Sequence, residues 1–395
     1  MEKIIVVGAG LSGATIARLF AENGYNVTVL DKRENIGGNL YDYVDKSGIR
    51  IQPYGRHVFH TNDKIVFDFL SLFTEWSKYE HKILAKVRKD KLVPVPFNLN
   101  SLYALFPEDA AKRIEEVLKA EVGSEKELPI MRLKDHKSEE IRNFADYVYK
   151  NIFYIYTMKQ WGFKPEHLGE EVMGRVPVRI SRDDRAFSDT YQYMPKKGFT
   201  QMITNLLRHP RIQLKLRTDA KKILKLQDGE ILLNDKPFEG KLFYTGCVDE
   251  LFNYENGTLP YRSLKFKTIK KKCSSFQRAA VVNYTTSNKY TRTIEFSKFT
   301  CEPQDSTLIV REYPVPFKKG KNIPYYPIPI EKNRAHYNEY ATRAKKYKNL
   351  YLLGRLATYE YINMDEAVKQ AMDLFTKITD VVVDGEFIND MTKGI

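Results

Sequence analysis

The chain has 395 residues, of which 43% are hydrophobic, and it carries a formal net charge of +14 at pH 7. A chain of this length can bury a large core and is expected to divide into two or three domains. The positive charge suits nucleic acid, an anionic membrane or a phosphorylated substrate, but the lysine runs are short and lack the interleaved aromatic residues of a base-stacking surface. We therefore expect no nucleic acid partner and a largely solvated surface charge.

The apolar residues and the cysteines argue against two further classes of protein. No apolar stretch approaches the length of a membrane span, and the N-terminus enters a strand pattern at once. Cys247, Cys273 and Cys301 lie far apart and form no CxxC pair, which argues against a disulfide framework and a zinc site. We expect no membrane insertion, no metal and a cytoplasmic location.

The first 31 residues have the pattern of a dinucleotide-binding βαβ unit. An apolar run over 4–7 is followed by Gly8-x-Gly10-x-x-Gly13, a helical stretch and a second apolar run that ends at Asp31. Gly8 permits a tight turn, Gly10 lets the backbone approach a pyrophosphate, and Gly13 lets the helix pack close to the strand. A carboxylate at Asp31 can accept hydrogen bonds from both ribose hydroxyls, which favours FAD or NAD over a 2′-phosphorylated cofactor.

A second glycine pair, Gly37-Gly38, follows directly after Asp31 and precedes Asn39. An extended FAD needs a second backbone loop that approaches its phosphates and ribityl chain without a Cβ atom in the way. A plain surface turn is the alternative interpretation of the pair. Its position beside the ribose site favours FAD.

The rest of the chain alternates between helical and strand patterns. Segment 54–61 is rich in aromatic residues and histidine; helices are expected from 63, from 107 to Gly123, over 138–149, from Gly198 and over 365–377. Buried strands are expected at 242–246 and 349–355, and the β-branched alternation at 280–284, 292–296 and 307–311 predicts an antiparallel sheet.

These elements predict an α/β fold with three parts. The first is a discontinuous Rossmann-like FAD-binding domain (1–79, 196–250 and 345–395), the second a helical insertion domain (80–152), and the third an antiparallel β-sheet substrate domain (153–195 and 251–344).

Ten segments occur in an order that is typical of one enzyme family. They are Gly8-x-Gly10-x-x-Gly13, Gly37-Gly38-Asn39, Tyr54-Gly55-x-His57-x-Phe59-His60-Thr61, Tyr156-Thr157-x-Lys159-Gln160-Trp161-Gly162, Val176-Pro177-Val178-Arg179, Tyr191-Gln192, Tyr261-Arg262-Ser263-Leu264, Tyr290-Thr291-Arg292, Glu312-Tyr313-Pro314 and Gly354-Arg355-Leu356. Together they resemble the bacterial UDP-galactopyranose mutases over nearly the whole chain.

The resemblance implies an intramolecular transferase, an isomerase that converts UDP-galactopyranose to UDP-galactofuranose with no net redox change. In that family N5 of reduced FAD attacks the anomeric carbon and displaces UDP, and the opened sugar recloses through a different hydroxyl. The resemblance also implies a homodimer, an external reductant or NAD(P)H that reduces the flavin, and a role in cell-surface polysaccharide biosynthesis.

The resemblance assigns residues to the substrate and to catalysis. Arg179 and Arg292 bracket the pyrophosphate, where a planar guanidinium pairs with phosphate oxygens; His57 and His60 approach the flavin ring. Other substrate residues by position are Phe153, Tyr156, Thr157, Trp161, Tyr191, Asn283, Tyr313 and Tyr361.

The resemblance and the glycine motifs together assign the cofactor site. Its residues are Gly8, Gly10, Leu11, Ser12, Gly13, Asp31, Lys32, Gly38, Asn39, His57, His60, Gly354, Arg355, Tyr361 and Met364.

Several residues near the expected substrate depart from the family pattern. Arg56 replaces a small residue or proline, His81 replaces asparagine, Asn363 replaces a carboxylate, and Ile152 replaces an aromatic residue. Because Arg56, His81 and Asn363 would line the substrate pocket, the same reaction on UDP-N-acetylgalactosamine or another hexose or deoxyhexose nucleotide is the alternative. A flavin oxidase or dehydrogenase of the amine-oxidase type, and a protein that binds a UDP-sugar or flavin without turnover, are more distant alternatives.

Overall fold

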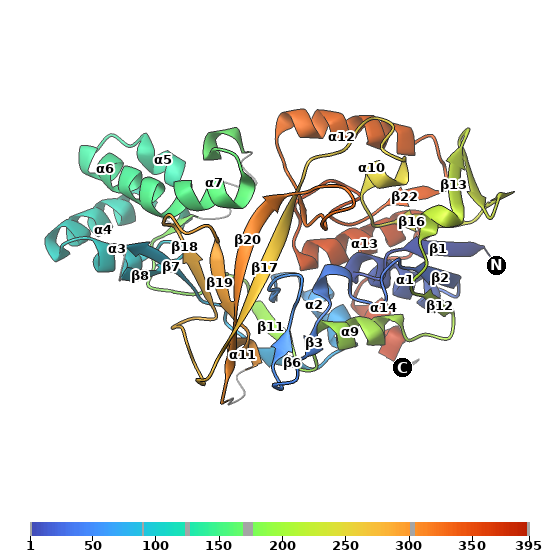
Figure 1. Ribbon diagram of the computed structural model, residues 1–395, viewed down its shortest axis with the longest axis horizontal. Helices are drawn as coiled ribbons and strands as arrows, with labels where there is room; N and C mark the ends of the chain where they lie inside the picture. The colour runs from blue at the N-terminus through green and yellow to red at the C-terminus, as the bar shows by residue number, and fades with distance from the viewer. Residues whose placement is uncertain (1, 89–90, 123–126, 169–176, 301–304, 393–395) are drawn as a thin grey trace.

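A computed structural model describes residues 2–88, 91–122, 127–168, 177–300 and 305–392. Figure 1 shows three parts side by side: a parallel sheet with its helices on the right, a group of helices on the left, and a large sheet with long strands between them.

A five-stranded parallel sheet forms the nucleotide-binding part. Its strands, in spatial order, are β12 (Ile212–Lys215), β2 (Asn26–Leu30), β1 (Lys3–Val7), β16 (Lys241–Tyr244) and β22 (Leu350–Leu352). The two strands expected late in the chain, at 242–246 and 349–355, are confirmed as β16 and β22. The order is that of a Rossmann-like sheet, so the predicted fold class is confirmed.

Both faces of this sheet are buried, which explains the continuous apolar run of β1. Ile4 and Val6 face a core that also contains Phe20, while Ile5 faces a second core on the opposite side. The first face is covered by α1 (Leu11–Glu22), α9 (Gly198–Leu207) and α13 (Met364–Thr379). The other packs against α10 (Val248–Leu251), α12 (Glu331–Ala344), and the small sheet of β13 (Leu224–Gln227), β14 (Glu230–Leu233) and β15 (Lys236–Pro237).

The large sheet has seven strands. In spatial order they are β21 (Tyr326–Pro327), β17 (Tyr261–Lys271), β20 (Thr307–Pro316), β19 (Arg292–Glu295), β18 (Val281–Tyr284), β7 (Ile83–Arg88) and β8 (Lys91–Val95). All neighbours pair antiparallel except β18 and β7, which run parallel. The three expected antiparallel strands are confirmed as β18, β19 and β20.

Two parts of the sheet differ from the prediction. Residues 83–88 and 91–95, which the prediction placed in the helical domain, form β7 and β8 of this sheet; Pro94 is tolerated because β8 lies at the sheet edge. The long strand β17 was not expected, because its lysines weaken the strand pattern. Lys265 and Lys267 occupy alternate positions on the solvent-facing side, so that Lys265 is exposed while Leu264 is buried.

The helical part has its own apolar core. It contains α3 (Leu99–Leu105), α4 (Glu108–Val122), α5 (Ile130–Lys134), α6 (Glu139–Val148), a π-helical turn (Tyr149–Tyr154) and α7 (Ile155–Trp161). The helices expected after 107 and over 138–149 are confirmed as α4 and α6, whereas Gly123 lies outside the described residues. Beside it the short strands β9 (Glu127–Leu128) and β10 (Val178–Arg179) pair with each other.

Short elements connect the three parts. They are β3 (Tyr43–Val44), β4 (Arg50–Ile51), β5 (Phe59–Thr61), β6 (Trp76–Lys78), β11 (Tyr191–Pro195), α2 (Lys64–Ser71), α11 (Ser297–Thr300) and α14 (Gly385–Thr392), with short 3-10 turns at Gly38–Leu40, Pro165–His167 and Ala220–Lys222. Strand β11 pairs with β5 on one side and β6 on the other.

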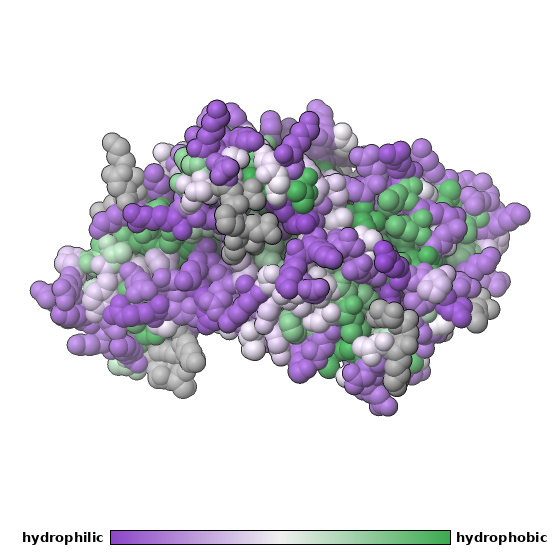
Figure 2. Space-filling model, turned by 90° about the horizontal axis from the view of Figure 1, so that it is seen from below, coloured by the Kyte–Doolittle hydropathy of each residue, from purple (hydrophilic) through white to green (hydrophobic). Residues whose placement is uncertain are grey.

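Hydrophilic residues cover most of the face shown in Figure 2, and apolar residues appear there only in separate groups. Within the part of the chain that the structure describes, no helix combines the length and apolar character needed to cross a bilayer.

Candidate active site

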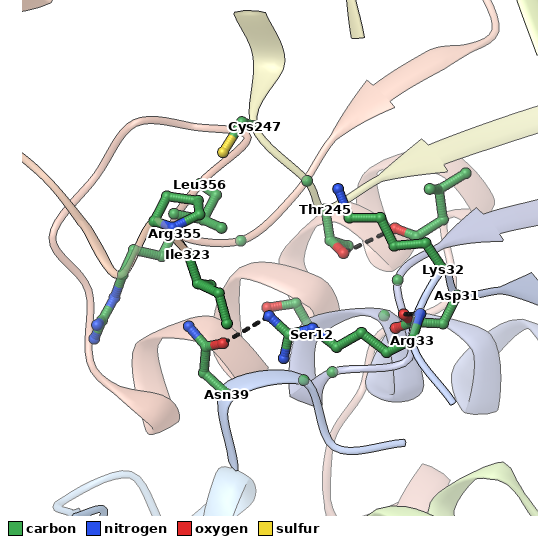
Figure 3. A pocket seen from close by; sticks show the side chains of 18 of the residues that line it. Ser12, Asp31, Lys32, Arg33, Asn39, Thr245, Cys247, Ile323, Arg355 and Leu356 are labelled. Carbon is green, nitrogen blue, oxygen red and sulfur yellow. Dashed lines mark hydrogen bonds between the residues drawn. The ribbon is translucent and has the colours of Figure 1, made fainter. Parts of the chain in front are cut away.

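A cavity of about 540 Å³ lies at the carboxyl ends of the parallel strands (Figure 3). Its walls include the segments that directly follow β1, β2, β16 and β22. Open α/β sheets bind ligands in this position, and the volume falls in the range of roughly 300–1,000 Å³ typical of ligand sites. Every residue predicted for the cofactor lines the cavity except His60 and Tyr361.

Two glycine loops form one wall of this cavity. A Cβ atom at Gly38 would lie 3.1 Å from the Gly10 Cα, and the Gly37 N–H donates to the Ala9 carbonyl over 2.8 Å. Gly38 has a φ of +56°, in the left-handed region that favours glycine. The second glycine pair is therefore part of a continuous backbone cradle, which suits an extended dinucleotide and not only a surface turn.

Asp31 connects this cradle to the end of β2. Its carboxylate accepts hydrogen bonds from the backbone N–H groups of Ala9 and Arg33, each over 2.8 Å. Figure 3 shows Asp31, Lys32 and Arg33 close together at one end of the cavity. The Lys32 ammonium pairs with Glu250 over 2.9 Å, and Arg33 donates to Asn39 over 3.0 Å, so the end expected to hold ribose is polar and well ordered.

The opposite end of the cavity contains His57 and Arg355. Burial, together with the nearby charges of Arg355 and Arg56, lowers the pKa of His57 to about 3. The imidazole is therefore neutral at physiological pH, and its Nδ1 has no hydrogen-bond partner among the described residues. Met364 and Asn363 also line this end, and the Asn363 backbone N–H donates to Glu366 at the start of α13.

A second group of polar residues surrounds Arg292, the first residue of β19. Its neighbours across the sheet are Asn283 on β18 and Glu312 on β20. The Arg292 Nε lies 3.1 Å from a Glu312 carboxylate oxygen, and Nη2 donates to the Tyr156 hydroxyl over 2.5 Å and to Gln160 Oε1 over 3.4 Å. Burial alone would lower the pKa of Arg292, but the Glu312 carboxylate and the Tyr156 hydroxyl raise it, so the guanidinium stays charged.

Arg56 links this group to the cavity, because the next residue, His57, lines the cavity wall. Its Nε is buried without a partner, and among the described residues it forms no ion pair. Burial and the charge of Arg292 lower the pKa of Arg56 to about 10. Burial, then Arg56 and Arg292, also lower the pKa of His81, whose Nε2 is unpartnered. The guanidinium groups of Arg56 and Arg292 both lie near one carboxylate, that of Glu312. Two positive charges therefore face one negative charge, which makes the region suited to an anionic ligand.

His60 does not line this cavity but pairs with a carboxylate. Its Nδ1 lies 3.0 Å from the Asp189 carboxylate, and its ring stacks on Phe187 with centroids 3.6 Å apart. Burial would raise the pKa of Asp189, but the hydrogen bond and charge of His60 lower it. His60 and Asp189 thus form a histidine–carboxylate pair, and neither residue lines the cavity.

Arg179 is held by the helical part. It lies opposite Glu127 in the β9–β10 pair, and its Nε donates to that carboxylate over 2.5 Å. Its other nitrogens donate to the carbonyls of Arg185 and Ala186. The Nε, Nη1 and Nη2 atoms of Arg179 are thus each engaged with a protein acceptor.

The predicted aromatic residues lie in several different environments. Trp161 and Tyr361 pack together with Tyr326, with Trp161–Tyr361 centroids 5.2 Å apart, and Arg355 lies over Tyr361 at 5.1 Å. Phe153 instead lies in the helical core and is 5% exposed. Tyr191 stacks on Phe67, and Tyr313 packs against Tyr290. For Thr157 the structure gives only its half-buried place on α7.

Known proteins resemble the chain over most of its length. Residues 151–361 match the family model described as UDP-galactopyranose mutase, and residues 6–73 match that of an NAD(P)-binding Rossmann-like domain. The chain is 33% identical to dTDP-fucopyranose mutase of Escherichia coli over 381 residues, which cover 94% of this chain and 97% of the relative. The chain belongs to the UDP-galactopyranose mutase family.

Further relatives agree with this assignment. UDP-galactopyranose mutase of Mycoplasma pneumoniae is 31% identical over 375 residues, covering 93% of this chain and 94% of the relative. The crystal structure of a reduced UDP-galactopyranose mutase superimposes with a TM-score of 0.73 at 18% identity, covering 98% of this chain and 97% of that structure. The protein is accordingly a sugar mutase, an isomerase.

The segment matched to the UDP-galactopyranose mutase family contains both elements that meet at Arg292, namely α7 and the β18–β20 strands. Arg292 contacts Tyr156 and pairs across the sheet with Asn283, whereas Arg179 contacts Glu127, Phe153 packs in the helical core and Tyr191 stacks on Phe67.

The sequence analysis missed four polar residues of this region. Glu312 and Gln160, which both contact Arg292, lie inside motifs that resemble the family, so their signal was present but unassigned. Lys159 also lies inside such a motif. Asp189 has no local signal, because only the pairing of β5 with β11 brings its segment to His60.

Proposed function

We propose that the protein is a flavin-dependent mutase that interconverts the pyranose and furanose forms of a nucleotide-linked hexose, and that its cofactor is FAD in the reduced state. The observation that carries the proposal is the continuity of Arg56 and His57. Arg56 has a buried, unpartnered Nε and lies close enough to Arg292 for the two charges to interact, and His57, the next residue, lines the cavity.

The cavity supports FAD through its residues. The Gly10 and Gly38 loops leave space that a Cβ atom would occupy, and Asp31 presents a carboxylate where ribose hydroxyls are expected. His57, neutral at physiological pH, suits hydrogen bonding to a polar ring edge because its Nδ1 is free. Reduced FAD, when bound in this cavity, would supply the nucleophile for the anomeric carbon.

The residues of this chain then act on the nucleotide sugar. Arg292, held charged by Glu312, binds the diphosphate and stabilises the negative charge that develops as it departs. Tyr156 and Gln160 fix the guanidinium plane by accepting from Nη2. Arg292, fixed in this way, also holds the released nucleoside diphosphate while the sugar closes into the other ring form. The diphosphate then bonds to the anomeric carbon again.

The sugar is the open part of the proposal. UDP-galactopyranose is the first candidate, and UDP-N-acetylgalactosamine or a deoxyhexose nucleotide such as dTDP-fucopyranose are the alternatives. Arg56 and His81 favour keeping the alternatives, since each offers an unpartnered buried nitrogen close to Arg292. We further propose that an external donor or NAD(P)H reduces the flavin. We also propose that the protein is a homodimer, which size-exclusion chromatography with light scattering tests.

Incubation of the dithionite-reduced enzyme with these three nucleotide sugars, followed by chromatographic separation of the ring forms, tests the function. We expect a furanose product from at least one of them, none from the oxidised enzyme, and none from Arg292→Ala at wild-type flavin content. Oxygen consumption with formation of an oxidised product would instead indicate a flavin oxidase. Binding of all three sugars without conversion would indicate a binding protein.

A further inference from the structure

The side chain of Lys159 ends inside a ring of backbone carbonyls. Its Nζ donates to the carbonyls of Thr286 over 3.1 Å, Asn288 over 3.2 Å and Tyr290 over 3.2 Å, and also to that of Tyr284. An ammonium has three protons, so four acceptors occupy it completely. Among the described residues no carboxylate pairs with it, and the carbonyl dipoles alone balance its charge.

All four carbonyls belong to the hairpin between β18 and β19. Asn283 lies directly before this hairpin, and Arg292 follows it. The hairpin closes with a hydrogen bond from the Tyr284 N–H to the Thr291 carbonyl over 2.7 Å. Its carbonyls converge on one point, where they would repel one another without a positive charge between them.

Helix α7 therefore holds the hairpin at two places one turn apart. Lys159 binds the carbonyls, and Tyr156 and Gln160 accept from Arg292. Residues three and four apart share one helix face, which explains why the three side chains reach the same hairpin. Arg262 fixes the end of α7 in turn, donating to the carbonyls of Gln160 over 3.0 Å and Lys159 over 3.2 Å.

We propose that Lys159 is a positioning residue for Arg292: its ammonium serves as a built-in cation that orders the hairpin 284–290 and so fixes the guanidinium that binds the diphosphate. The inference rests on the proposed function, because it assumes that Arg292 binds the diphosphate of the substrate. It assigns to Lys159 no contact with the substrate or the flavin.

Replacement of Lys159 by alanine empties the carbonyl ring and tests the inference. We expect the Kd for UDP, measured by titration calorimetry of the flavin-loaded enzyme, to rise roughly 10- to 100-fold, since a displacement of about 1 Å at a binding group has effects of this size. The KM is expected to rise more than kcat falls. Lys289→Met is the matched control, because Lys289 is an exposed lysine of the same hairpin; it is expected to behave as wild type.

Cation rescue separates this role from a general loss of structure. Rings of backbone carbonyls coordinate K⁺ in place of its hydration shell, so K⁺ or ammonium at about 0.1 M is expected to restore UDP binding to Lys159→Ala. Tetramethylammonium at equal ionic strength, which is too large for the ring, is expected not to. Lys159→Met fills the same space without charge and is expected to show the defect without rescue.

Each outcome decides the inference. Wild-type UDP affinity in Lys159→Ala or Lys159→Met, or additive effects of Lys159→Met and Arg292→Lys in a double-mutant cycle, would overturn it. If Lys159→Ala fails to fold, the cycle with Lys159→Met decides. A wild-type enzyme that binds neither UDP nor dTDP would contradict the proposed function itself, whereas tight binding that is indifferent to Lys159 contradicts only this inference.

Discussion

Replacement of Gly10 by alanine should abolish tight FAD binding while leaving the fold intact. Gly10 has φ −82° and ψ −176°, an extended conformation that alanine adopts without strain. A Cβ atom built there meets no atom of the protein closer than the Gly38 Cα at 3.7 Å. The methyl group would instead project into the cavity wall where the cofactor's pyrophosphate is expected, because Gly10 and Gly38 both line that wall.

The expected effect follows from the contacts that the methyl group prevents. A hydrogen bond from a backbone N–H to a phosphate is worth about 1.5–3 kcal/mol. Loss of one or two of them corresponds to about 3 kcal/mol, or roughly a 150-fold rise in the Kd for FAD. The free energy of unfolding of the apoprotein should change by less than about 1 kcal/mol, since the smaller conformational freedom of alanine in the unfolded chain favours folding slightly.

Quenching of FAD fluorescence on titration with apoprotein measures the Kd, and urea unfolding of the apoprotein measures stability. Gly13→Ala is the informative contrast, because its Cβ would lie 1.9 Å from the Gly8 carbonyl oxygen and should impair folding itself. Wild-type FAD affinity in Gly10→Ala, or an apoprotein destabilised as strongly as Gly13→Ala, would refute the reasoning.

The remaining predictions concern charge. Arg292→Ala, which leaves Glu312 buried and unpaired, should raise the Kd for UDP at least about 100-fold, and calorimetry would contradict this if the affinity were unchanged. The folded-state pKa of His57, about 3, lies below the unfolded value of 6.5, so between these pH values the unfolded chain binds one more proton than the folded chain. The contribution of His57 to the free energy of unfolding therefore falls as the pH drops from about 6.5 toward 3. Between pH 7 and 5 the loss is about 2 kcal/mol; urea unfolding of His57→Gln should lack this loss, and equal pH dependence in both proteins would disprove the assignment. His60→Ala removes the hydrogen bond and the charge that lower the pKa of Asp189, so the NMR titration of the Asp189 carboxyl should shift to higher pH; an unchanged titration would show that the pair does not form in solution.

The nucleotide-binding part was the most predictable from sequence. Its features follow from local requirements that the sequence shows directly. The glycines of the first motif allow a turn and a close backbone approach, the apolar run forms β1, and Asp31 marks the end of a strand. Strands β16 and β22 were also found because both are short and consist mostly of apolar residues. The sequence pattern did not predict β7, β8 and β17 as strands. Proline and lysine weaken the strand pattern there, although a strand at a sheet edge tolerates proline and a strand with one solvated face tolerates lysine.

The polar contacts of the candidate site were less predictable, because they depend on chain segments that only the fold brings together. Arg292 was found through its motif, but its partner Glu312 follows from strand pairing and Gln160 from the docking of α7. The carbonyl ring around Lys159 has no side-chain pattern at all, since its ligands are backbone atoms. Arg179 was expected to bracket the pyrophosphate together with Arg292; in the structure its guanidinium pairs with Glu127 on the neighbouring strand, and its predicted role stays a prediction.

The central claim is that the reduced flavin bonds transiently to the sugar while Arg292 holds the diphosphate. Reduction of a mixture of dithionite-reduced enzyme and its substrate with cyanoborohydride, followed by mass spectrometry of the released flavin, tests it most directly. The account predicts FAD that has gained the mass of the sugar, for true substrates only, and little of it in Arg292→Ala. Unmodified FAD from wild-type enzyme that is actively converting the sugar would contradict the account.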